Sequence, residues 1–329
     1  MKILVISGGD LEKGSIKYRI AQYTDFLEAN GLKLDFVKRS EIDRSFIPKL
    51  KMYDVVFNQR CLIRASLARK IIANSRRLVF DFDDAIYTRP GKPHFWLTSL
   101  RVKRRLRIWI QGADVVTTAN HFLAAYARKY SSCVKVIPNA VDLETWKPAT
   151  RERGETVTIG WAGAPVNIPN IERLEPVLSE LLSKYPFLKL AVFSGKRPNL
   201  KCPFDYYSFE PGKEPEFVRS LDIGLLPLVN EEYSKGKSPI KAIQYLACGV
   251  PVVGNPIGAT KEILNDDNSI AVSSDEEWIA ALESLVKDNQ RRASMGRAGR
   301  AHVERNHNIR LTAKQRLSVF LGTDTACAA

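Results

Sequence analysis

The segment KGKSPIKAIQYLACGVPVV, residues 235–253, carries the clearest structural pattern in the chain. Ser238 is a typical N-cap residue, the proline after it suits the first helical position, and Gly249 suits the position that ends a helix. We therefore expect a helix over Pro239–Cys248 and, directly after it, a strand over Val250–Gly254. A helix followed at once by a β-branched strand is typical of an α/β fold with a parallel sheet.

The same alternation of strands and helices runs through the whole chain. A helix is predicted over Ile16–Asn30, because Asn30-Gly31 is a typical helix C-terminus. The polar stretch Asp142–Gly154 interrupts the pattern and predicts a linker. Further strands are expected at Lys2–Ser7, Leu32–Val37, Tyr53–Asn58, Arg77–Phe82, Asp114–Thr118, Val134–Pro138, Thr156–Ala162, Lys189–Ser194, Ile223–Leu228 and Ser269–Val272.

This pattern predicts the fold class. Apolar strands alternating with helices are typical of doubly wound parallel sheets that are covered on both faces. Because the pattern restarts after the linker, we expect two Rossmann-like domains, residues 1–150 and 151–307, which face each other across a cleft.

The composition is that of a globular protein, with 329 residues, 45% apolar and 26% charged. No apolar run reaches roughly 18 residues, the length that indicates a membrane-spanning helix. The opening MKILVIS is too short for the apolar core of a signal peptide and predicts a strand. The five scattered cysteines fit neither a disulfide framework nor a metal site. We therefore expect a cytoplasmic protein.

The charge is concentrated in the first half. Residues 1–150 hold 27 Lys and Arg against 14 Asp and Glu, a net charge of +13, whereas residues 151–329 hold 23 against 22, a net charge of +1. This asymmetry predicts an acidic partner for the first half: a membrane surface, an anionic substrate or nucleic acid. Nucleic acid is not expected, because no recognition fold or aromatic stacking motif is present. The sequence does not indicate an oligomeric state.

Three lysines gather where a helix dipole disfavours them. Lys241 lies in the first turn of the predicted helix, and Lys235 and Lys237 lie just before it. Each such charge costs roughly 0.3–1 kcal/mol unless an anion is bound there. We therefore expect a phosphate at this helix N-terminus. Gln244 and Tyr245 share a face with Lys241 and could reach a group attached to that phosphate. The alternative is a solvated lysine cluster.

Four motifs follow one another along the chain: IPNAVD (137–142), DIGLLPL (222–228), the segment 235–253 and NPIG (255–258). Together they resemble the glycosyltransferases of the GT-B fold, and most of all the retaining family 4, the glycogen-synthase-like group. The resemblance covers nearly the whole chain. It implies that the first domain binds the acceptor and the second binds a nucleotide-sugar. It also implies that residues 308–329 form a tail whose helix crosses back to the first domain.

One pair of family residues is replaced. Many members carry two glutamates eight positions apart, the first near the donor sugar and the second on the ribose; here these positions hold Gly236 and Gln244. The chain resembles instead a subgroup with K-x-x-x-K-x-x-Q-Y-x-A-x-G, which it matches at Lys237, Lys241, Gln244 and Tyr245. This implies that the two lysines bind the donor diphosphate and that Gln244 binds the ribose. Because the first glutamate is absent, retention and inversion of configuration both stay open.

Other donor-side residues are predicted from their place in the second domain. Gly163 lies in the loop after the first strand of that domain, where a diphosphate can bind. Ser238 is placed at the same diphosphate as the cap of the lysine-bearing helix. By resemblance to the family, the segment that borders the base is Ser208, Phe209 and Glu210.

The string LVFDFDDAIY ends a strand of the first domain with three carboxylates, Asp81, Asp83 and Asp84. Catalytic groups gather at this edge of parallel sheets, and crowded like charges raise pKa values toward that of a general base. Subgroup members carry a similar D-x-D-D-A where related enzymes have a His-Asp or His-Gly pair beside the acceptor. We expect Asp83 first, and Asp84 second, to be the base or acceptor ligand. The alternative is that these aspartates cap the following turn.

Two other classes of function share parts of this pattern. The D-x-D string resembles the motif of haloacid-dehalogenase-like phosphatases, which use an aspartyl nucleophile and Mg²⁺; Asp81 and Asp83 would take these roles. Ala85 stands where that motif has Thr or Val, and the motif follows the fourth strand rather than the first. The missing glutamate suggests a non-catalytic sugar-nucleotide-binding protein, and an epimerase of the same fold would act on the donor without an acceptor.

Five residues are assigned to the acceptor side from their location near the ends of predicted strands: Gly9, Arg19, Arg60, Asn120 and His121. For either arginine, a buried salt bridge is the alternative.

The stretch SLRVKRRLRIWIQ, residues 99–111, interleaves five cations with apolar residues. On a helix this pattern is typical of a segment that lies on anionic lipid, where each cation contributes about 1 kcal/mol. The alternative is a solvated helix face. The expected membrane contacts are Arg101, Lys103, Arg104, Arg105, Arg107 and Trp109.

These motifs predict a hexosyltransferase that moves a sugar from a nucleoside diphosphate to a hydroxyl of a lipid-linked or cell-surface glycan of the lipopolysaccharide, O-antigen or capsule type. The enzyme would work at the inner face of the cell membrane, as a peripheral protein, with retention of configuration. Because lysines replace a metal ion at the leaving diphosphate, we expect neither a metal nor another cofactor.

Overall fold

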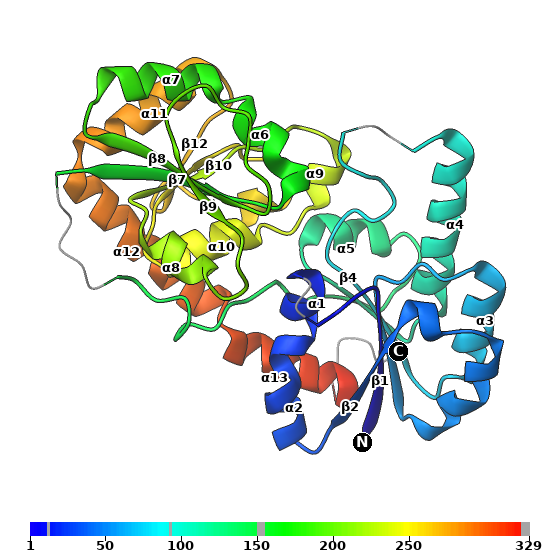
Figure 1. Cartoon of the computed structure of the whole chain (residues 1–329). Coiled ribbons are helices and arrows are strands. Elements are labelled where there is room, and N and C mark those ends of the chain that lie inside the picture. The colour runs from blue at the N-terminus through cyan, green and yellow to red at the C-terminus, as the bar shows by residue number, and fades with distance from the viewer. Residues whose placement is uncertain (12–13, 92–93, 150–154, 324–329) are drawn as a thin grey trace. The chain divides into compact units, whose positions relative to one another are not determined.

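The computed structural model describes residues 1–11, 14–91, 94–149 and 155–323. Contacts divide the chain into two compact units (Figure 1). Unit 1 comprises Met1–Asn139, Glu231–Ser238 and Ile309–Ala329; unit 2 comprises Ala140–Asn230 and Pro239–Asn308. The segment Glu231–Ser238 thus belongs to unit 1, although about ninety residues of unit 2 separate it from Asn139 along the chain. Of the predicted linker, residues 150–154 lie outside the described part of the chain.

Unit 1 is built on a parallel sheet with the strand order β2-β1-β3-β4-β5-β6. Its central strands are buried on both faces, which explains their nearly continuous apolar sequences. The strands are β1 Lys2–Ser7, β2 Lys33–Lys38, β3 Val55–Gln59, β4 Leu78–Phe82, β5 Val115–Thr118 and β6 Val134–Val136.

Unit 2 repeats the design with the order β12-β11-β10-β7-β8-β9, again with parallel neighbours. Counted from β7, this is the strand order of the Rossmann fold. The predicted fold class, two doubly wound α/β units, is confirmed. The edge strand β9 was not predicted, because most of its residues are exposed and it lacks an apolar run. The strands are β7 Val157–Ala162, β8 Leu188–Ser194, β9 Asp205–Ser208, β10 Ile223–Leu226, β11 Val252–Gly254 and β12 Ser269–Ala271.

The first predicted helix is broken in the structure. Instead of one helix over Ile16–Asn30, α1 ends at Arg19 and α2 begins at Thr24, because Ile20 has a φ of −147° that no helix accommodates. The C-terminus is as predicted, since Gly31 has a φ of +81°. The helices of unit 1 are α1 Gly14–Arg19, α2 Thr24–Ala29, α3 Ala65–Asn74, α4 Trp96–Gly112, α5 His121–Ala127, α9 Glu232–Gly236 and α13 Ile309–Leu321, with 3₁₀ segments Ala21–Tyr23, Arg39–Glu41 and Arg44–Met52.

The lysine-bearing helix of unit 2 starts differently from the prediction. Pro239 occupies its N-cap position, and no side chain caps it. The hydroxyl of Ser238 instead accepts a hydrogen bond from Asn139 Nδ2 at 2.5 Å, so the N-cap role predicted for Ser238 is wrong. The helices of unit 2 are α6 Ile168–Glu172, α7 Glu175–Lys184, α8 Glu214–Arg219, α10 Ile240–Ala247, α11 Asp275–Lys287 and α12 Asn289–Asn306, with 3₁₀ segments Pro165–Asn167 and Gly258–Glu262.

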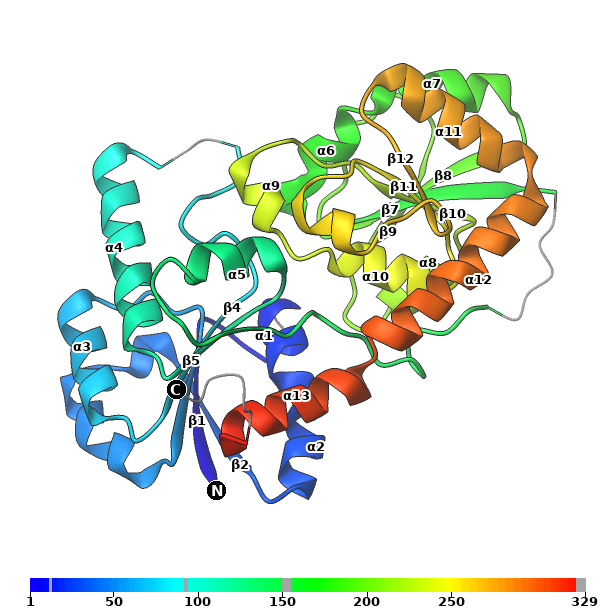
Figure 2. The ribbon, with the colours of Figure 1, turned by 180° about the vertical axis from the view of Figure 1, so that it is seen from behind.

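The C-terminal helix α13 packs on unit 1. It runs beside α2 in both views of the ribbon (Figures 1 and 2). Phe320 meets Phe57 of β3 edge to face, with ring centroids 5.5 Å apart, and the hydroxyls of Tyr23 and Thr312 are 2.9 Å apart. These apolar contacts cover one face of the first sheet, and a second apolar cluster covers its other face.

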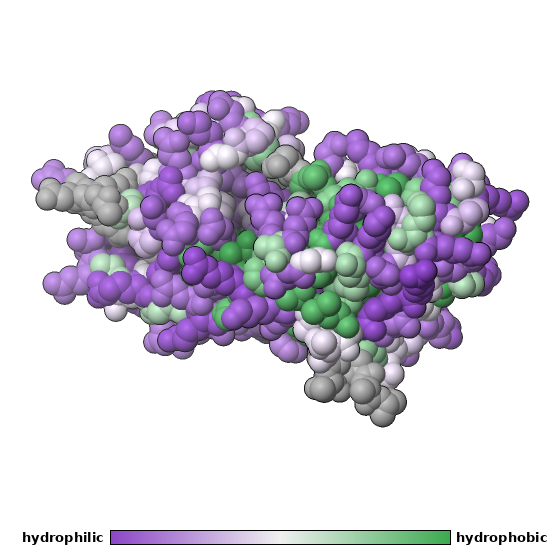
Figure 3. All heavy atoms as spheres, turned by 90° about the horizontal axis from the view of Figure 1, so that it is seen from below, coloured by the Kyte–Doolittle hydropathy of each residue, from purple (hydrophilic) through white to green (hydrophobic). Residues whose placement is uncertain are grey.

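On the face drawn in Figure 3, hydrophilic residues predominate and hydrophobic ones gather in smaller groups. In the described part of the chain, no helix has both the length and the apolar character needed to cross a membrane. Among the described cysteines, Cys61, Cys202 and Cys248 are buried and form no disulfide, whereas Cys133 is disulfide-bonded, which the sequence did not predict.

Candidate active site

Asp81, at the carboxyl end of β4, belongs to a fully buried ion network in unit 1. Its carboxylate accepts hydrogen bonds from Arg19 Nε at 3.0 Å, Arg19 Nη2 at 2.6 Å and Thr117 Oγ1 at 2.6 Å. Arg316 Nη1 of α13 lies 3.7 Å away. Burial alone would raise the pKa of Asp81, but the charges of Arg19 and Arg316 and these hydrogen bonds lower it. Asp81 is therefore a structural carboxylate.

Asp83 and Asp84 lie just beyond β4 and share one arginine. Arg60 Nη1 donates to Asp83 Oδ1 at 3.0 Å and to Asp84 Oδ2 at 2.7 Å. Burial raises the pKa of Asp83 to about 6; Arg60 opposes this shift, and the charge of Asp84 adds to it. A carboxylate that ionises near neutral pH suits a general base, the role predicted for Asp83.

The backbone of Arg60 is strained. Among the described residues other than glycine, Arg60 alone has a positive φ, of +49°. This conformation costs a side-chain-bearing residue roughly 1–3 kcal/mol, and such strain collects at functional sites. Arg60 directly follows β3, which pairs with β1 at the point where the strand order of the sheet reverses. Ligands of doubly wound sheets bind at this point, beyond the carboxyl ends of the strands.

Two residues assigned to the acceptor side serve the fold instead. Arg19 is fully buried, and its Nη1 donates to the carbonyl of Ile137 at 2.6 Å and to Asn139 Oδ1 at 3.0 Å. It thus has no surface for an acceptor, and the buried salt bridge weighed as its alternative is what the structure shows. Asn120 caps α5, since its Oδ1 accepts from Leu123 N at 2.9 Å, and it is buried.

The remaining acceptor-side residues lie nearer to solvent. Gly9 is half-buried, and its carbonyl accepts a hydrogen bond from Ser7 Oγ at 3.0 Å. His121, the first residue of α5, is exposed. Of the five predicted residues, Arg60 is the one that the structure brings to the carboxylates Asp83 and Asp84.

In unit 2, the strand order reverses between β7 and β10, and Gly163 follows β7 directly. Its N–H donates to the carbonyl of Phe193 at 3.0 Å, so this amide is already engaged within the sheet. A β-carbon on Gly163 would lie 2.1 Å from the indole of Trp161, which explains why glycine is needed here. A diphosphate contact by Gly163 stays a prediction.

The loops that follow β7, β8 and β9 converge at one edge of the second sheet. A β-carbon on Gly195 would contact Pro165 Cγ at 3.3 Å and Phe209 Cβ at 3.9 Å. Ser208, Phe209 and Glu210 are exposed there, and the Phe209 ring rests edge-on against Phe193 with centroids 5.7 Å apart. An exposed aromatic ring beside small loops can serve as a stacking platform for a base.

Lys241 lies in the first turn of α10, as predicted, and it already has an anion. Its Nζ forms an ion pair with Glu214 Oε1, from the first residue of α8. Both side chains are about a quarter exposed, at 24% and 23%. The predicted cost of a cation at this helix start is therefore offset by a carboxylate of the same unit. Lys237 and Ser238 belong to unit 1, and Ser238 is buried there.

The rest of the α10 motif points into unit 2. The hydroxyl of Tyr245 accepts a hydrogen bond from Ala162 N at 2.8 Å, and its ring packs under Gly224 of β10. Gln244 is 1% exposed. Tyr245 thus fixes α10 on the sheet, and the ribose contact predicted for Gln244 stays a prediction.

The basic helix α4 differs from the prediction at one residue. Trp109 is fully buried and stacks on Phe80 with centroids 5.9 Å apart, so it is not a membrane contact. The physical reason is helical spacing, because Trp109 shares a face with the buried residues Leu106 and Ile110. Arg105 is half-buried. The exposed cations of this helix are Arg101, Lys103, Arg104 and Arg107.

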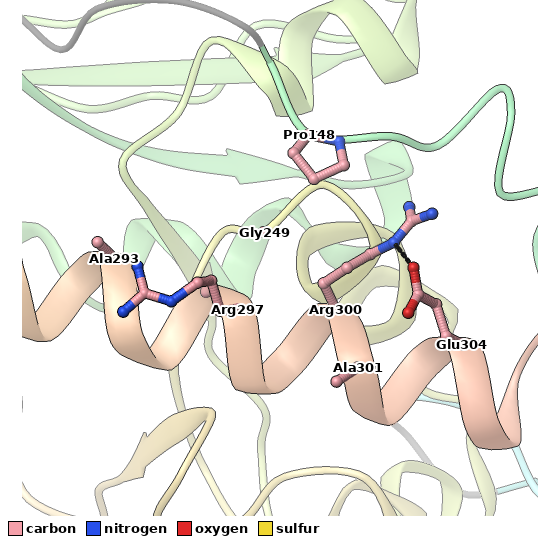
Figure 4. A pocket seen from close by; sticks show the side chains of 8 residues that line it. Pro148, Gly249, Ala293, Arg297, Arg300, Ala301 and Glu304 are labelled. Carbon is pink, nitrogen blue, oxygen red and sulfur yellow. Dashed lines mark hydrogen bonds and ion pairs between the residues drawn. The ribbon is translucent and has the colours of Figure 1, made fainter.

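A hollow of about 320 Å³ on unit 2 lies between α12, Pro148 and Gly249, the residue that follows the C-cap of α10 (Figure 4). Arg300 in its wall donates to Glu304 Oε1 at 2.7 Å and to the carbonyl of Ala247 at 2.8 Å, which closes the C-terminus of α10. A β-carbon on Gly296 would lie 2.1 Å from the carbonyl oxygen of Gly249. The hollow therefore marks the close approach of α10 and α12.

Some residues of the site were missed by sequence analysis. Glu214 is 27 residues from Lys241, and no local pattern signals their pairing. Tyr233 comes from α9, far along the chain from β4. Burial raises the pKa of Tyr233, and the negative charge of Asp84 raises it further, so the two side chains interact. Within the described residues, no group of His, Cys, Asp or Glu has the arrangement of a metal site.

Comparison with known proteins adds to this geometry. Residues 208–318 match the family described as Glycosyl transferase-like. The D-inositol 3-phosphate glycosyltransferase of Segniliparus rotundus is 24% identical over 221 residues, which are 59% of this chain and 48% of that protein. That of Paenarthrobacter aurescens is 33% identical over 91 residues, 27% of this chain and 21% of that protein. The chain thus spans half or less of the length of the curated relatives it matches.

Solved structures match over more of the chain. Sucrose-phosphate synthase of Thermosynechococcus elongatus has a TM-score of 0.75 at 14% identity, and the match covers 98% of both chains. Anabaena HepE in complex with UDP and glucose has a TM-score of 0.74 at 15% identity, covering 98% of this chain and 100% of that one. The chain therefore has the GT-B fold, and its residues 208–318 match a glycosyl transferase-like family.

Proposed function

We propose that this chain is a glycosyltransferase that moves a sugar from a nucleoside diphosphate to an acceptor hydroxyl. The observation that carries the proposal is Asp83, a buried carboxylate whose pKa burial raises to about 6 and which pairs with Arg60, the residue that follows β3 where the first sheet reverses its strand order. The family match over residues 208–318 supports the reaction class. HepE, of the same fold, is described in complex with UDP and with UDP-glucose, which supports a nucleotide-sugar donor.

In the proposed mechanism, ionised Asp83 accepts the proton of the acceptor hydroxyl. The acceptor oxygen then bonds to the anomeric carbon of the donor, and the bond between this carbon and the diphosphate oxygen breaks. Lys241 stabilises the negative charge that gathers on the leaving diphosphate, in the role that a metal ion fills elsewhere. Arg60 orients Asp83 and offsets part of its charge.

The burial of Asp81 argues against the phosphatase alternative. Both of its carboxylate oxygens accept hydrogen bonds from Arg19, and its side chain has no exposed surface. A nucleophile needs access to its substrate, so this aspartate is unsuited to attack a phosphate ester.

Nucleotide binding provides the test of the donor site. We expect one of UDP, GDP, dTDP and CMP to raise the midpoint of thermal unfolding with EDTA present, because a ligand that binds only the folded state stabilises it by mass action. Lys241→Ala should abolish the shift. Glu214→Gln should enlarge it, because Lys241 would then no longer be neutralised by the carboxylate. If neither variant changes the shift of the responding nucleotide, Lys241 does not bind the diphosphate.

The acceptor is proposed to be a lipid-linked or cell-surface glycan, used by an enzyme that attaches to the inner face of the membrane. Four apolar side chains, those of Phe95, Trp96, Leu97 and Leu100, are exposed at the start of α4, by 64%, 61%, 47% and 59%. The exposed cations of the helix follow them directly. An apolar tip with adjacent cations suits insertion into an anionic interface.

Removing the apolar tip should weaken binding to vesicles. Replacing Phe95 and Trp96 together by serine is expected to reduce partitioning onto phosphatidylglycerol vesicles by about tenfold or more, because burying one aromatic side chain is worth roughly 1.5–3 kcal/mol. Phe187→Ser, at an exposed aromatic residue of unit 2, is the matched control and should change nothing. Equal partitioning of the double variant and the wild type in a sedimentation assay would rule out insertion through this tip.

A further inference from the structure

Unit 1 contains a cavity of about 290 Å³ beside the carboxylates Asp83 and Asp84. It is lined by three arginines and two hydroxyl-bearing residues, and none of its lining residues is acidic. The lining residues are Arg39, Arg60, Leu62, Ile86, Thr88, Arg89, Pro90 and Tyr233.

Charges of both signs surround this cavity. Asp83 and Asp84 share Arg60, the charge of Glu231 acts on Tyr233 in the wall, and Arg39 and Arg89 bring two further guanidinium groups to the lining. On the side of α4, more arginines follow. Burial lowers the pKa of Arg105, and the charges of Arg101, Arg39 and Arg64 lower it further, so each of these three arginines lies close enough to act on Arg105.

Guanidinium groups converging on a cavity suit one class of ligand. Arginine binds phosphate through two parallel hydrogen bonds, and its charge-assisted contacts are among the strongest in proteins. The hydroxyl groups of Thr88 and Tyr233 offer further donors to an anionic oxygen.

The position of Arg60 links the cavity to the chemistry. Its guanidinium contacts both carboxylates and also lines the cavity. Its strained backbone is tied to the carbonyl of Asp81 by a hydrogen bond of 2.7 Å from Arg60 N. A group bound in the cavity would thus lie next to Asp83, the proposed base.

We infer that this cavity binds a phosphate or diphosphate group of the acceptor, so that the acceptor hydroxyl is presented to Asp83. The inference rests on the proposed function, because it names the chemical class of the acceptor for the same site. Arg39 and Arg89 would bind the phosphate oxygens, and Arg60 would separate their negative charge from that of the two carboxylates.

Calorimetric titration with inorganic pyrophosphate tests this site. The wild type is titrated in the presence of the nucleotide that stabilises it, so that the donor site is filled. Because a hydrogen bond to a charged group is worth roughly 1.5–3 kcal/mol, we expect the double variant of Arg39→Gln and Arg89→Gln to bind pyrophosphate at least about tenfold more weakly. Arg44→Gln, at an exposed arginine of unit 1 that does not line the cavity, should leave the affinity unchanged.

Two further arms separate the possible outcomes. Lys241→Ala should keep its affinity for pyrophosphate, so a failure of the donor site and a failure of this cavity give different results. Equal pyrophosphate affinity in the double variant and the wild type, with a retained melting transition, would overturn the inference. If pyrophosphate also displaces the wild type from phosphatidylglycerol vesicles, and the double variant is insensitive to it, the phosphate belongs to a lipid headgroup. Binding of pyrophosphate without effect on vesicles indicates a soluble phosphorylated acceptor; both results support the site.

Discussion

Replacing Asp83 by asparagine is expected to lower the rate of sugar transfer by about 10²–10⁴-fold, the usual contribution of a general base. Asparagine keeps the shape of the side chain and can still contact Arg60, but it cannot take up the proton of the acceptor hydroxyl. The thermal shift caused by the nucleotide should be unchanged, because Lys241, the proposed ligand of the diphosphate, lies in unit 2 and Asp83 lies in unit 1. Asp84→Asn is the matched control. Asp84 also accepts a hydrogen bond from Arg60 but is the second candidate for the base, so its replacement should lower the rate of transfer less than Asp83→Asn does.

The pH dependence of the wild type follows from the same carboxylate. Because only ionised Asp83 accepts a proton, the rate should rise with pH through about 6 and level off above it. A rate that is independent of pH between about 5 and 7, roughly one unit on either side of this pKa, would exclude Asp83 as the base.

Stability provides an independent check on Asp83. Its pKa in the folded chain lies above the ordinary aspartate value of about 3.9. Between these two values the folded state keeps a proton that the unfolded state releases, so the free energy of unfolding falls as the pH rises through this window. Asp83→Asn cannot ionise and escapes this loss. The variant should therefore be at least as stable as the wild type at pH 7.

Asp81→Asn should have the opposite effect. Removing this carboxylate leaves Arg19 and Arg316 buried without their anion, and breaking a buried ion pair in this way costs about 3–5 kcal/mol. We expect the free energy of unfolding of unit 1 to fall by this amount, measured by urea denaturation. Activity should be lost only through unfolding. A folded Asp81→Asn protein of normal stability and no activity would contradict the structural role and revive the phosphatase alternative.

The order of strands and helices could be predicted from the sequence, because each buried strand is a short run of apolar residues. The first strand is predicted and observed at Lys2–Ser7, and the reset of the pattern near residue 150 separates the two sheets. Trp109 could also have been placed correctly, because its spacing from Leu106 and Ile110 puts it on the apolar face of the helix. The polar β9 lacked such a signal.

The candidate site was predicted only in part, because contacts between residues far apart in the sequence leave no local pattern. The three aspartates were found as a local string, but their roles depend on partners far along the chain. Arg19 stands 62 residues from Asp81 and makes that carboxylate structural. Arg60 stands 23 residues from Asp83, where burial raises the pKa of the carboxyl group and Arg60 opposes the rise. Similarly, the need for an anion at Lys241 was predicted from the helix dipole, but nothing local could show that Glu214 supplies one.

Release of nucleotide from sugar donors tests the central claim most directly. The purified chain is incubated in EDTA with UDP-, GDP-, dTDP- and CMP-sugars, with and without an extract of cell-envelope lipids. We predict that one donor releases its nucleotide, that the extract accelerates this release and takes up the sugar, and that Asp83→Asn is at least about a hundredfold slower. A chain that binds a nucleoside diphosphate but releases none from any donor would be a sugar-nucleotide-binding protein, and the glycosyltransferase proposal would be wrong.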